Sequence, residues 1–378
     1  MSPFRHIVIL SLGLICAAQA LAQQLPVPPA LAAKSWLLLE TGSGQVLTAE
    51  KPDERIEPAS LTKLMTAYLT FAALRQKTIA LDTPVTVSQK AWKTGGSKMF
   101  IRVDTQVPVE DLIKGMIVQS GNDACVTLAE GIAGSEEAFV AAMNQTALRL
   151  GMRSSHFVNA TGLPHPEHRT TARDLATLAQ AVMRDFPSDY KYYAIKEFSY
   201  AGITQANRNR LLWLDPNVDG VKTGHTESAG YCLIASSRRD NRRLLSVVLG
   251  TASDPARATE SQKLLNYGLQ FHETVRLYKA SQPVSVFRIY KGRGSELRIG
   301  FNQDFYVTVP RGSANRLKAE VIARQPILAP ASRGQAIATL RLKLDDTVLA
   351  DYPMVALQDV PVASLIGRLW DSLMLLFK

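Results

Sequence analysis

The stretch that decides the fold covers residues 218–251 and reads VDGVKTGHTESAGYCLIASSRRDNRRLLSVVLGT. It contains three apolar, partly alternating runs at 218–226, 229–237 and 242–251, and short polar turns separate them. Alternation is typical of strands, and short turns join antiparallel neighbours. The stretch therefore predicts a three-stranded antiparallel meander.

The segments around this meander are mostly helical in pattern. Apolar residues recur at helical spacing in residues 60–76, 109–151, 171–185 and 261–272. Residues 35–48 instead alternate around Gly42-Ser43-Gly44 and predict a β-hairpin. Strand, helices and then strands is the order of an α/β (α+β) layer fold, in which helices cover one antiparallel sheet.

Composition shifts near residue 272, and only short strand patterns follow. They lie at residues 284–290, 296–301, 305–309, 317–323 and 337–344, with Gly and Pro between them. This pattern predicts a small all-β domain over residues 272–360, after a first domain over residues 23–271.

The N-terminus has the pattern of a secretory signal peptide at residues 1–22. Arg5 precedes an apolar run at residues 7–18, and small residues precede a cleavage point after Ala22, with Ala20 as second choice. An uncleaved anchor is less favoured because the run is short for a bilayer span. The pattern predicts an exported protein.

The C-terminal segment, residues 361–378, has apolar side chains along one helical face. Trp370 suits a membrane interface, whereas Arg368 and Asp371 make a transmembrane span unfavourable. We expect an amphipathic helix on a membrane surface, and a helix docked on the protein core is the second possibility.

Composition narrows the class of protein. The chain has 378 residues, 46% hydrophobic and 20% charged, which fits two to three globular domains and excludes disordered, collagen-like and polytopic membrane chains. The formal net charge of +10 is spread along the chain, so it favours an anionic surface or wall polymer and not nucleic acid. Removal of residues 1–22 leaves Cys125 and Cys232, whose pairing stays open.

Three short motifs carry chemistry. In Ser60-Leu61-Thr62-Lys63, helical spacing puts the lysine amine within reach of the serine hydroxyl. Ser120-Gly121-Asn122 offers a hydroxyl for proton relay and an amide to bind a peptide bond. Lys222-Thr223-Gly224 lies in the first strand of the meander, where Gly224 lets a substrate backbone come close.

Each motif also occurs at a second place with less suitable surroundings. These copies are Ser188-Asp189-Tyr190-Lys191, predicted in a loop or at a solvated helix start, Ser313-Ala314-Asn315, predicted in a turn, and Lys93-Thr94-Gly95, predicted in a loop. Only the first set has the order Ser-x-x-Lys, Ser-x-Asn, Lys-Thr-Gly with each motif on a plausible element. That set resembles the penicillin-binding proteins and serine β-lactamases.

The neighbourhoods of the motifs are similar to those of the periplasmic D-alanyl-D-alanine carboxypeptidases, the low-molecular-mass penicillin-binding proteins. The resemblance implies a penicillin-binding-protein-like catalytic domain, no cofactor and no metal. It implies that Ser60 is the nucleophile, Lys63 its general base, Ser120 a proton relay supported by Lys222, and Asn122 a ligand of the substrate peptide. It places the oxyanion hole at the backbone N–H groups of Ser60 and His225, and the terminal carboxylate at Thr223, with Arg257 at the place of the family's arginine. Gly224 completes the substrate-binding residues.

The function implied is removal of the terminal D-alanine from peptidoglycan stem peptides, with covalent inhibition by β-lactams, in wall maturation and cell shape. A serine β-lactamase, a D,D-endopeptidase and a catalytically silent wall-binding scaffold are the competing functions. The expected location is the periplasmic face of the inner membrane, held through the terminal helix. Paired helices would also suit a homodimer, and the oligomeric state stays open.

Several other residues suggest different sites. His156, His165 and His168 could form a metal site, but they lie among prolines, and we expect a solvated loop. Trp213 and the tyrosines at 190–193 could line a substrate groove, and we favour packing. Cys125, one helical turn after Asn122, is expected to be buried packing and not a nucleophile.

Overall fold

The structure is a computed structural model that describes residues 27–376. The predicted signal peptide, residues 1–22, lies outside the described residues. The central sheet has five antiparallel strands in the order β2-β1-β9-β8-β7. Their bounds are β1 Ser35–Glu40, β2 Val46–Glu50, β7 Val218–Thr226, β8 Gly230–Arg239 and β9 Arg242–Thr251. The predicted hairpin and meander are confirmed.

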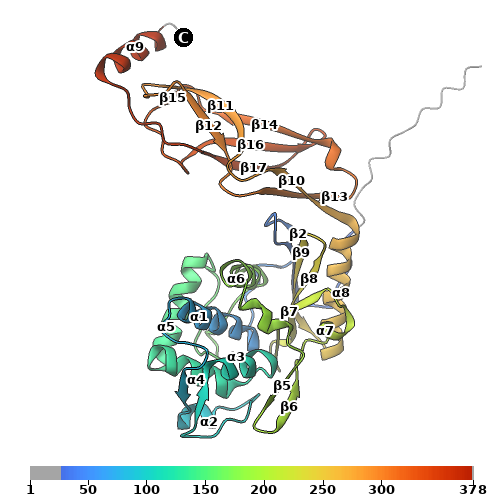
Figure 1. The fold of residues 1–378 in the computed structure, drawn as a ribbon. Coiled ribbons are helices and arrows are strands. Elements are labelled where there is room, and N and C mark those ends of the chain that lie inside the picture. The colour runs from blue at the N-terminus through green and yellow to red at the C-terminus, as the bar shows by residue number, and fades with distance from the viewer. Residues whose placement is uncertain (1–26, 377–378) are drawn as a thin grey trace, which may run out of the picture.

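Helices cover both faces of this sheet, as Figure 1 shows. One layer holds the 3-10 turn η1 (Ala59–Thr62), α1 (Lys63–Arg75), α3 (Val109–Val118), α4 (Asn122–Ala133), α5 (Glu136–Leu150) and α6 (Ala172–Asp185). The other face packs against α8 (Asp254–Phe271). Strand β1 shows why, because Leu37 and Leu39 enter one core cluster whereas Trp36 and Leu38 enter the other.

Helix α8 begins seven residues before the predicted start. Ser253 accepts a hydrogen bond from the backbone N–H of Ala256, and Pro255 lies in the first turn. Both are helix-start signals that the apolar periodicity alone does not show. The short elements of this part are β3 (Pro84–Thr86), α2 (Gln89–Lys93), β4 (Gln106–Pro108), η2 (Tyr190–Ala194), β5 (Glu197–Tyr200), β6 (Ile203–Ala206) and α7 (Leu211–Leu214).

After α8 the chain forms strands and one 3-10 turn as far as residue 356. Strands β10 (His272–Tyr278) and β13 (Phe305–Pro310) pair, and a six-stranded sheet follows the order β14-β16-β17-β12-β11-β15. Its strands are β11 (Pro283–Tyr290), β12 (Glu296–Gly300), β14 (Leu317–Ala323), β15 (Ile327–Leu328), β16 (Ala336–Leu344) and β17 (Thr347–Ala356), and η3 covers Ala314–Arg316. The pattern missed three strands of this part: β10, which follows the helix without a break, the two-residue β15, and β17, which contains Pro353.

The last helix, α9 (Leu365–Leu375), extends from the far end of the β-sheet, and Ser364 caps it. None of its residues is buried, and Ile366 is 81% exposed. The apolar face of this helix is therefore not docked on the protein core. Within residues 27–376, no helix has the length and apolarity needed to span a bilayer.

Candidate active site

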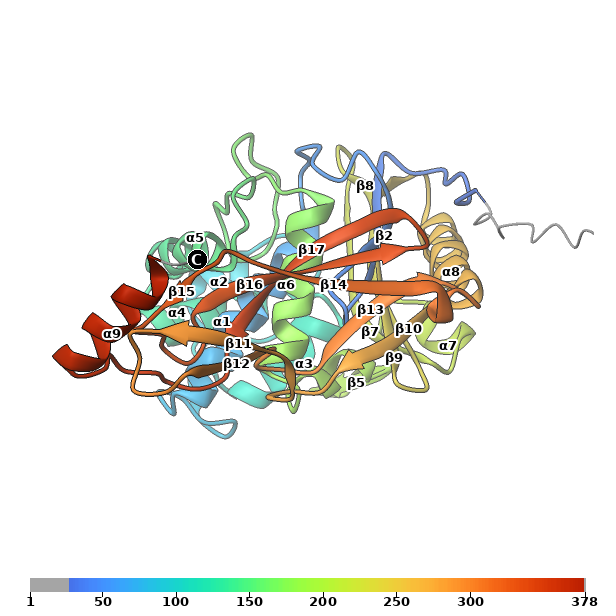
Figure 2. The same cartoon turned by 90° about the horizontal axis from the view of Figure 1, so that it is seen from above.

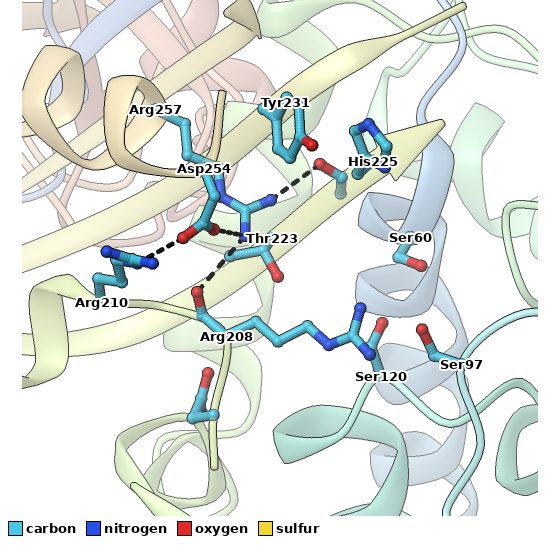
Figure 3. A pocket seen from close by; sticks show the side chains of 12 residues that line it. Ser60, Ser97, Ser120, Arg208, Arg210, Thr223, His225, Tyr231, Asp254 and Arg257 are labelled. Carbon is cyan, nitrogen blue, oxygen red and sulfur yellow. Dashed lines mark hydrogen bonds and ion pairs between the residues drawn. The ribbon is translucent and has the colours of Figure 1, made fainter. Parts of the chain in front are cut away.

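A cavity of about 470 Å³ opens where η1, β7 and the loop before α4 meet. Its lining residues are Ser60, Ser97, Ser120, Asn207, Arg208, Arg210, Thr223, Gly224, His225, Tyr231, Asp254 and Arg257. Figure 3 shows Ser60 and Ser120 on one side of it and Arg257 on the other. The structure thus brings together residues from all three predicted motifs, together with Arg257.

Lys63 is buried directly beneath Ser60. Its side chain is 1% exposed, and Nζ lies 2.9 Å from Ser60 Oγ. The same Nζ donates to Asn122 Oδ1 and to the Thr161 carbonyl oxygen, both at 2.6 Å. Burial lowers the pKa of Lys63 to about 8. A neutral amine can give its two hydrogens to those two acceptors, which leaves its lone pair for the Ser60 hydroxyl.

Lys222 is a second buried amine, next to Lys63. Nζ donates to Ser120 Oγ at 3.0 Å and to the Thr223 carbonyl oxygen at 3.1 Å, and the residue is 3% exposed. Burial and the nearby Lys63 hold the pKa of Lys222 well below its usual value. Ser120 lies in the loop before α4 and has a positive φ of 64°. In this backbone conformation Ser120 lines the cavity.

Asn122 and Asp123 fix the wall opposite β7. Asn122 Nδ2 donates to the Gly95 carbonyl oxygen at 2.7 Å. The buried Asp123 carboxylate accepts hydrogen bonds from the backbone N–H groups of Met99 and Phe100, at 3.0 and 2.9 Å. The second Lys-Thr-Gly copy, residues 93–95, is therefore part of the site wall through its backbone, and Ser97 beyond it reaches the cavity.

Strand β7 presents Thr223, Gly224 and His225 along the cavity edge. A Cβ atom on Gly224 would lie 3.1 Å from both the Pro58 carbonyl oxygen and Leu61 Cγ, so glycine allows β7 to approach η1. The His225 ring stacks on Tyr231 with centroids 3.9 Å apart.

Arg257 is held in place by several groups. Its side chain is 7% exposed, forms an ion pair with Asp254 and donates to the Gly224 carbonyl oxygen at 3.2 Å. Its guanidinium also lies 5.6 Å from the Tyr231 ring centroid. Arg210 forms a second ion pair with Asp254 (Figure 3). Burial lowers the pKa of Arg257.

The sequence did not predict six of the lining residues, which are Ser97, Asn207, Arg208, Arg210, Tyr231 and Asp254. Figure 3 shows the Arg208 side chain crossing the cavity towards Ser120. Its positive charge contributes to lowering the pKa of both Lys63 and Lys222. The sequence feature that marks this loop is Asn207-Arg208-Asn209, since asparagine side chains often bind nearby backbone groups in loops. Here Asn209 Nδ2 donates to the Gly220 carbonyl oxygen at 2.9 Å and holds the loop against β7.

The solvated-loop prediction was wrong for His168. This residue is 1% exposed, and its Nε2 lies 3.0 Å from Thr62 Oγ1, inside the first motif. Burial, together with the charges of His156 and His165, lowers the pKa of His168 to about 4. The loop folds back over η1, because Gly162 packs directly against the Ala59 carbonyl oxygen. No group of metal-ligating side chains gathers among residues 27–376.

The remaining candidate residues do not line the active-site cavity. Cys125 and Cys232 are both buried and unpaired, and burial raises the pKa of Cys125 to about 12, so its thiol is not a nucleophile at neutral pH. Tyr190, Tyr192 and Tyr193 are buried as expected. Trp213 is not packed inside, because it is 45% exposed, with Lys196 Nζ 6.0 Å from its ring centroid.

Comparison with known proteins gives the same picture along the chain. Residues 22–253 match the family model described as D-alanyl-D-alanine carboxypeptidase, and residues 272–362 match the C-terminal domain of penicillin-binding protein 5. The chain is 42% identical over 364 residues to D-alanyl-D-alanine carboxypeptidase DacC of Escherichia coli (strain K12), covering 94% of this chain and 91% of that protein.

Two solved structures extend the comparison to three dimensions. Penicillin-binding protein 5 from Haemophilus influenzae superposes with a TM-score of 0.86 at 39% identity, covering 89% of this chain and 99% of that one. Penicillin-binding protein D2 from Listeria monocytogenes, solved in an ampicillin-bound form, superposes with a TM-score of 0.59 at 28% identity. It covers 64% of this chain and 98% of that one.

Proposed function

The chain belongs to the D-alanyl-D-alanine carboxypeptidase family of serine peptidases, and from this premise we propose that Ser60 removes the terminal D-alanine of peptidoglycan stem pentapeptides through an acyl-enzyme. The observation that carries the proposal is the contact between Ser60 Oγ and Lys63 Nζ at 2.9 Å, with Lys63 buried and its pKa lowered to about 8. A buried amine of this pKa is a suitable general base near neutral pH.

Acylation begins when Ser60 Oγ attacks the carbonyl carbon of the penultimate D-alanine and Lys63 takes the hydroxyl proton. The backbone N–H groups of Ser60 and His225 stabilise the oxyanion of the tetrahedral intermediate. The C–N bond then breaks as Ser120 gives its hydroxyl proton to the leaving D-alanine nitrogen, and the proton that Lys63 took from Ser60 replaces it, so Lys63 is neutral again. Lys222, 3.0 Å from Ser120 Oγ, supports this transfer. Water hydrolyses the resulting ester and regenerates Ser60.

The terminal carboxylate binds at the cationic end of the cavity. Thr223 supplies a hydroxyl, and Arg257 and Arg208 supply positive charge. Asn122 contacts the substrate peptide only if its amide exchanges the Gly95 carbonyl oxygen for a substrate carbonyl, since both of its polar atoms are occupied in the free enzyme. Its first role is therefore to hold Lys63.

The test is release of D-alanine from diacetyl-Lys-D-Ala-D-Ala by wild type and by Ser60→Ala. We expect release by wild type and a loss on the order of 10³-fold or more in the variant. A β-lactam should leave a covalent adduct on Ser60, visible by mass spectrometry, because ampicillin binds the similar Listeria protein. Wild-type protein that releases no D-alanine would sink the proposal and favour a wall-binding scaffold.

The same assay, run with penicillin and with isolated wall, distinguishes the carboxypeptidase from a β-lactamase and from an endopeptidase. Rapid penicillin turnover would indicate a β-lactamase, but within residues 27–376 no glutamate lines the cavity to hold a hydrolytic water. Cleavage of cross-linked peptides, measured on isolated wall, would indicate the endopeptidase.

We also propose that the mature protein is exported and lies on the periplasmic side of the inner membrane, attached through residues 361–378. The support is the apolar surface of α9, where Leu365, Ile366 and Leu369 are at least 70% exposed. Deletion of residues 361–378 should release the protein from membranes, and unchanged pelleting of the deletion variant contradicts the anchor.

We assign the domains as 23–271 and 272–360, because α8 ends at Phe271 and β10 begins at His272.

A further inference from the structure

The C-terminal β part, residues 272–360, stands over α6 and over the turn between β1 and β2, as Figures 1 and 2 show. A second cavity is lined by residues of these segments. Its volume is about 490 Å³, within the range of small-ligand sites. Residues 41–44, Gln180 and Arg184 line it on the catalytic side, and the opposite wall is made by Phe301, residues 303–306, Tyr352 and Pro353. Its lining residues are all different from those of the active-site cavity.

One wall of this second cavity is aromatic. Phe301 and Phe305 stack with ring centroids 4.3 Å apart, and Tyr352 meets Phe305 edge-on at 4.8 Å. Phe305 and Tyr352 are partly exposed. A cluster of this kind holds its rings in fixed orientations and offers an apolar surface to a ligand that has one apolar face.

The charged groups around the cavity are already neutralised within the protein. Arg184 makes two hydrogen bonds to the Asp185 carboxylate, at 2.7 and 2.9 Å. The Asp304 carboxylate accepts hydrogen bonds from Arg276 at 2.8 Å and from the Ala280 backbone N–H at 2.9 Å. A charged ligand would thus find no free countercharge among the described lining residues, and its desolvation would be uncompensated.

The polar groups that remain are neutral. Gln303 is exposed, and Gln180 uses Nε2 to bind the Thr41 carbonyl oxygen and keeps Oε1 for a ligand. The Tyr306 hydroxyl donates to Asp304 Oδ2 at 3.4 Å and keeps its oxygen as an acceptor. Amides and hydroxyls beside aromatic rings suit a neutral ligand with hydroxyl and acetamido groups on an apolar ring face. That is the chemistry of an N-acetylated sugar.

We propose that this interdomain cavity binds N-acetylhexosamine units of the glycan strand to which the stem peptides are attached. The choice of polymer rests on the proposed function, whereas the choice of a neutral sugar rests on the cavity itself. Binding of the strand would raise the effective concentration of its stem peptides at Ser60. Small peptides without a glycan would gain nothing from this second site.

Contacts between the first domain and the C-terminal β part hold the two walls of the cavity in fixed positions. Ser43 Oγ and Thr308 Oγ1 are 2.8 Å apart, and Arg311 donates to the Gln270 and Leu269 carbonyl oxygens at 2.8 and 2.7 Å. A site built in advance in this way loses less entropy on binding than one that must form around its ligand.

The test uses tetra-N-acetylchitotetraose and the full mature protein in isothermal titration calorimetry. Gln303→Trp fills the cavity from an exposed position without removing a core side chain, and Gln325→Trp makes the same change at an exposed site outside the cavity. We expect wild type, Ser60→Ala and Gln325→Trp to bind the tetrasaccharide equally, and Gln303→Trp to bind at least about tenfold more weakly. Absence of binding by wild type, or equal binding by Gln303→Trp, overturns the proposal.

Kinetics separate this proposal from the proposed function. D-alanine release from diacetyl-Lys-D-Ala-D-Ala should be equal in wild type and Gln303→Trp, which also shows that the variant is folded. Release from isolated glycan strands carrying pentapeptides should show a KM at least about threefold higher in Gln303→Trp. An equal KM contradicts the role of the cavity. Tetrasaccharide binding without any peptidase activity would sink the proposed function alone.

Discussion

The motif Ser-x-x-Lys occurs twice in the chain, and the two copies differ in burial and in the contacts of the lysine. At residues 60–63 the lysine is 1% exposed and contacts Ser60, Asn122 and Thr161. At residues 188–191 both Ser188 and Lys191 are exposed, and Lys191 only approaches the Tyr192 ring at 5.6 Å. Burial and contacts from distant segments, not the motif, make the first lysine a base.

The other two motifs repeat this difference. Lys222-Thr223-Gly224 is buried in β7, the edge strand of the five-stranded sheet, whereas the copy at residues 93–95 lies in a loop and supplies one backbone carbonyl to Asn122. The Ser-x-Asn copy at residues 313–315 lies at η3, in the β part. Substituting the same residue type in both copies of each motif therefore tests whether surroundings decide function.

The largest difference should appear at the lysines. Lys63→Ala removes the base beneath Ser60, and we expect acylation by a fluorescent penicillin to slow by about 10³-fold. Lys191→Ala removes a surface amine and should change the rate by less than twofold. Stopped-flow fluorescence measures both. Similar rates in the two variants would mean that the buried lysine is not the base.

The pH dependence of wild type checks the same lysine. Only a neutral amine can accept the Ser60 proton, and burial lowers the pKa of Lys63 to about 8. The acylation rate should therefore rise with pH and reach half of its plateau near pH 8. A rate that falls through this range contradicts the assignment.

The next effect is expected at the asparagines. Asn122→Ala removes the acceptor of Lys63 Nζ and the donor to Gly95, so acylation should slow by about 100-fold, whereas Asn315→Ala should have no effect. Asn122→Asp tests the contact with Lys63 more directly. Its carboxylate would stabilise the protonated amine, so the midpoint of the pH profile should move upwards. An unchanged midpoint argues against contact between residue 122 and the base in solution.

A smaller effect is expected at the glycines of the two Lys-Thr-Gly copies. The Cβ of Gly224→Ala would press on Pro58 and Leu61, so β7 and η1 must separate, at a cost of about 1–3 kcal/mol in stability and about tenfold in acylation. A Cβ at Gly95 meets no described atom within 4 Å, so Gly95→Ala should behave as wild type. Thermal unfolding and penicillin acylation measure both effects, and equal behaviour of the two variants would contradict this close approach.

Local patterns predicted the sheet, most helices and every motif residue brought to the cavity, because alternation and helical spacing are properties of neighbouring residues. They could not find Arg208 or Asp254, which reach the cavity from a loop and from a helix start. They also misjudged His168, since the contact with Thr62 joins positions 106 residues apart. Burial of a side chain by segments far away in the sequence cannot be predicted from a single sequence.

The smallest effect should come from His168, which supports the first motif and has no counterpart at the second. Its pKa is about 4 when folded and near 6.5 when unfolded, so the unfolded chain binds more protons between these values. Stability must then fall as pH drops from about 6.5 to 4, by at most on the order of 3 kcal/mol.

The matched variants are His168→Gln and His165→Gln, compared by thermal unfolding at pH 7 and pH 5. His168→Gln cannot take up this proton, so its Tm should drop less than that of wild type between the two pH values. At pH 7 the same variant should be less stable by about 1 kcal/mol, because the ring packing on Phe157 is lost. His165 is partly exposed, and its substitution should leave the wild-type pH dependence in place. A His168→Gln curve parallel to wild type would show that His168 is not the buried neutral group that joins the loop to the Ser60 turn.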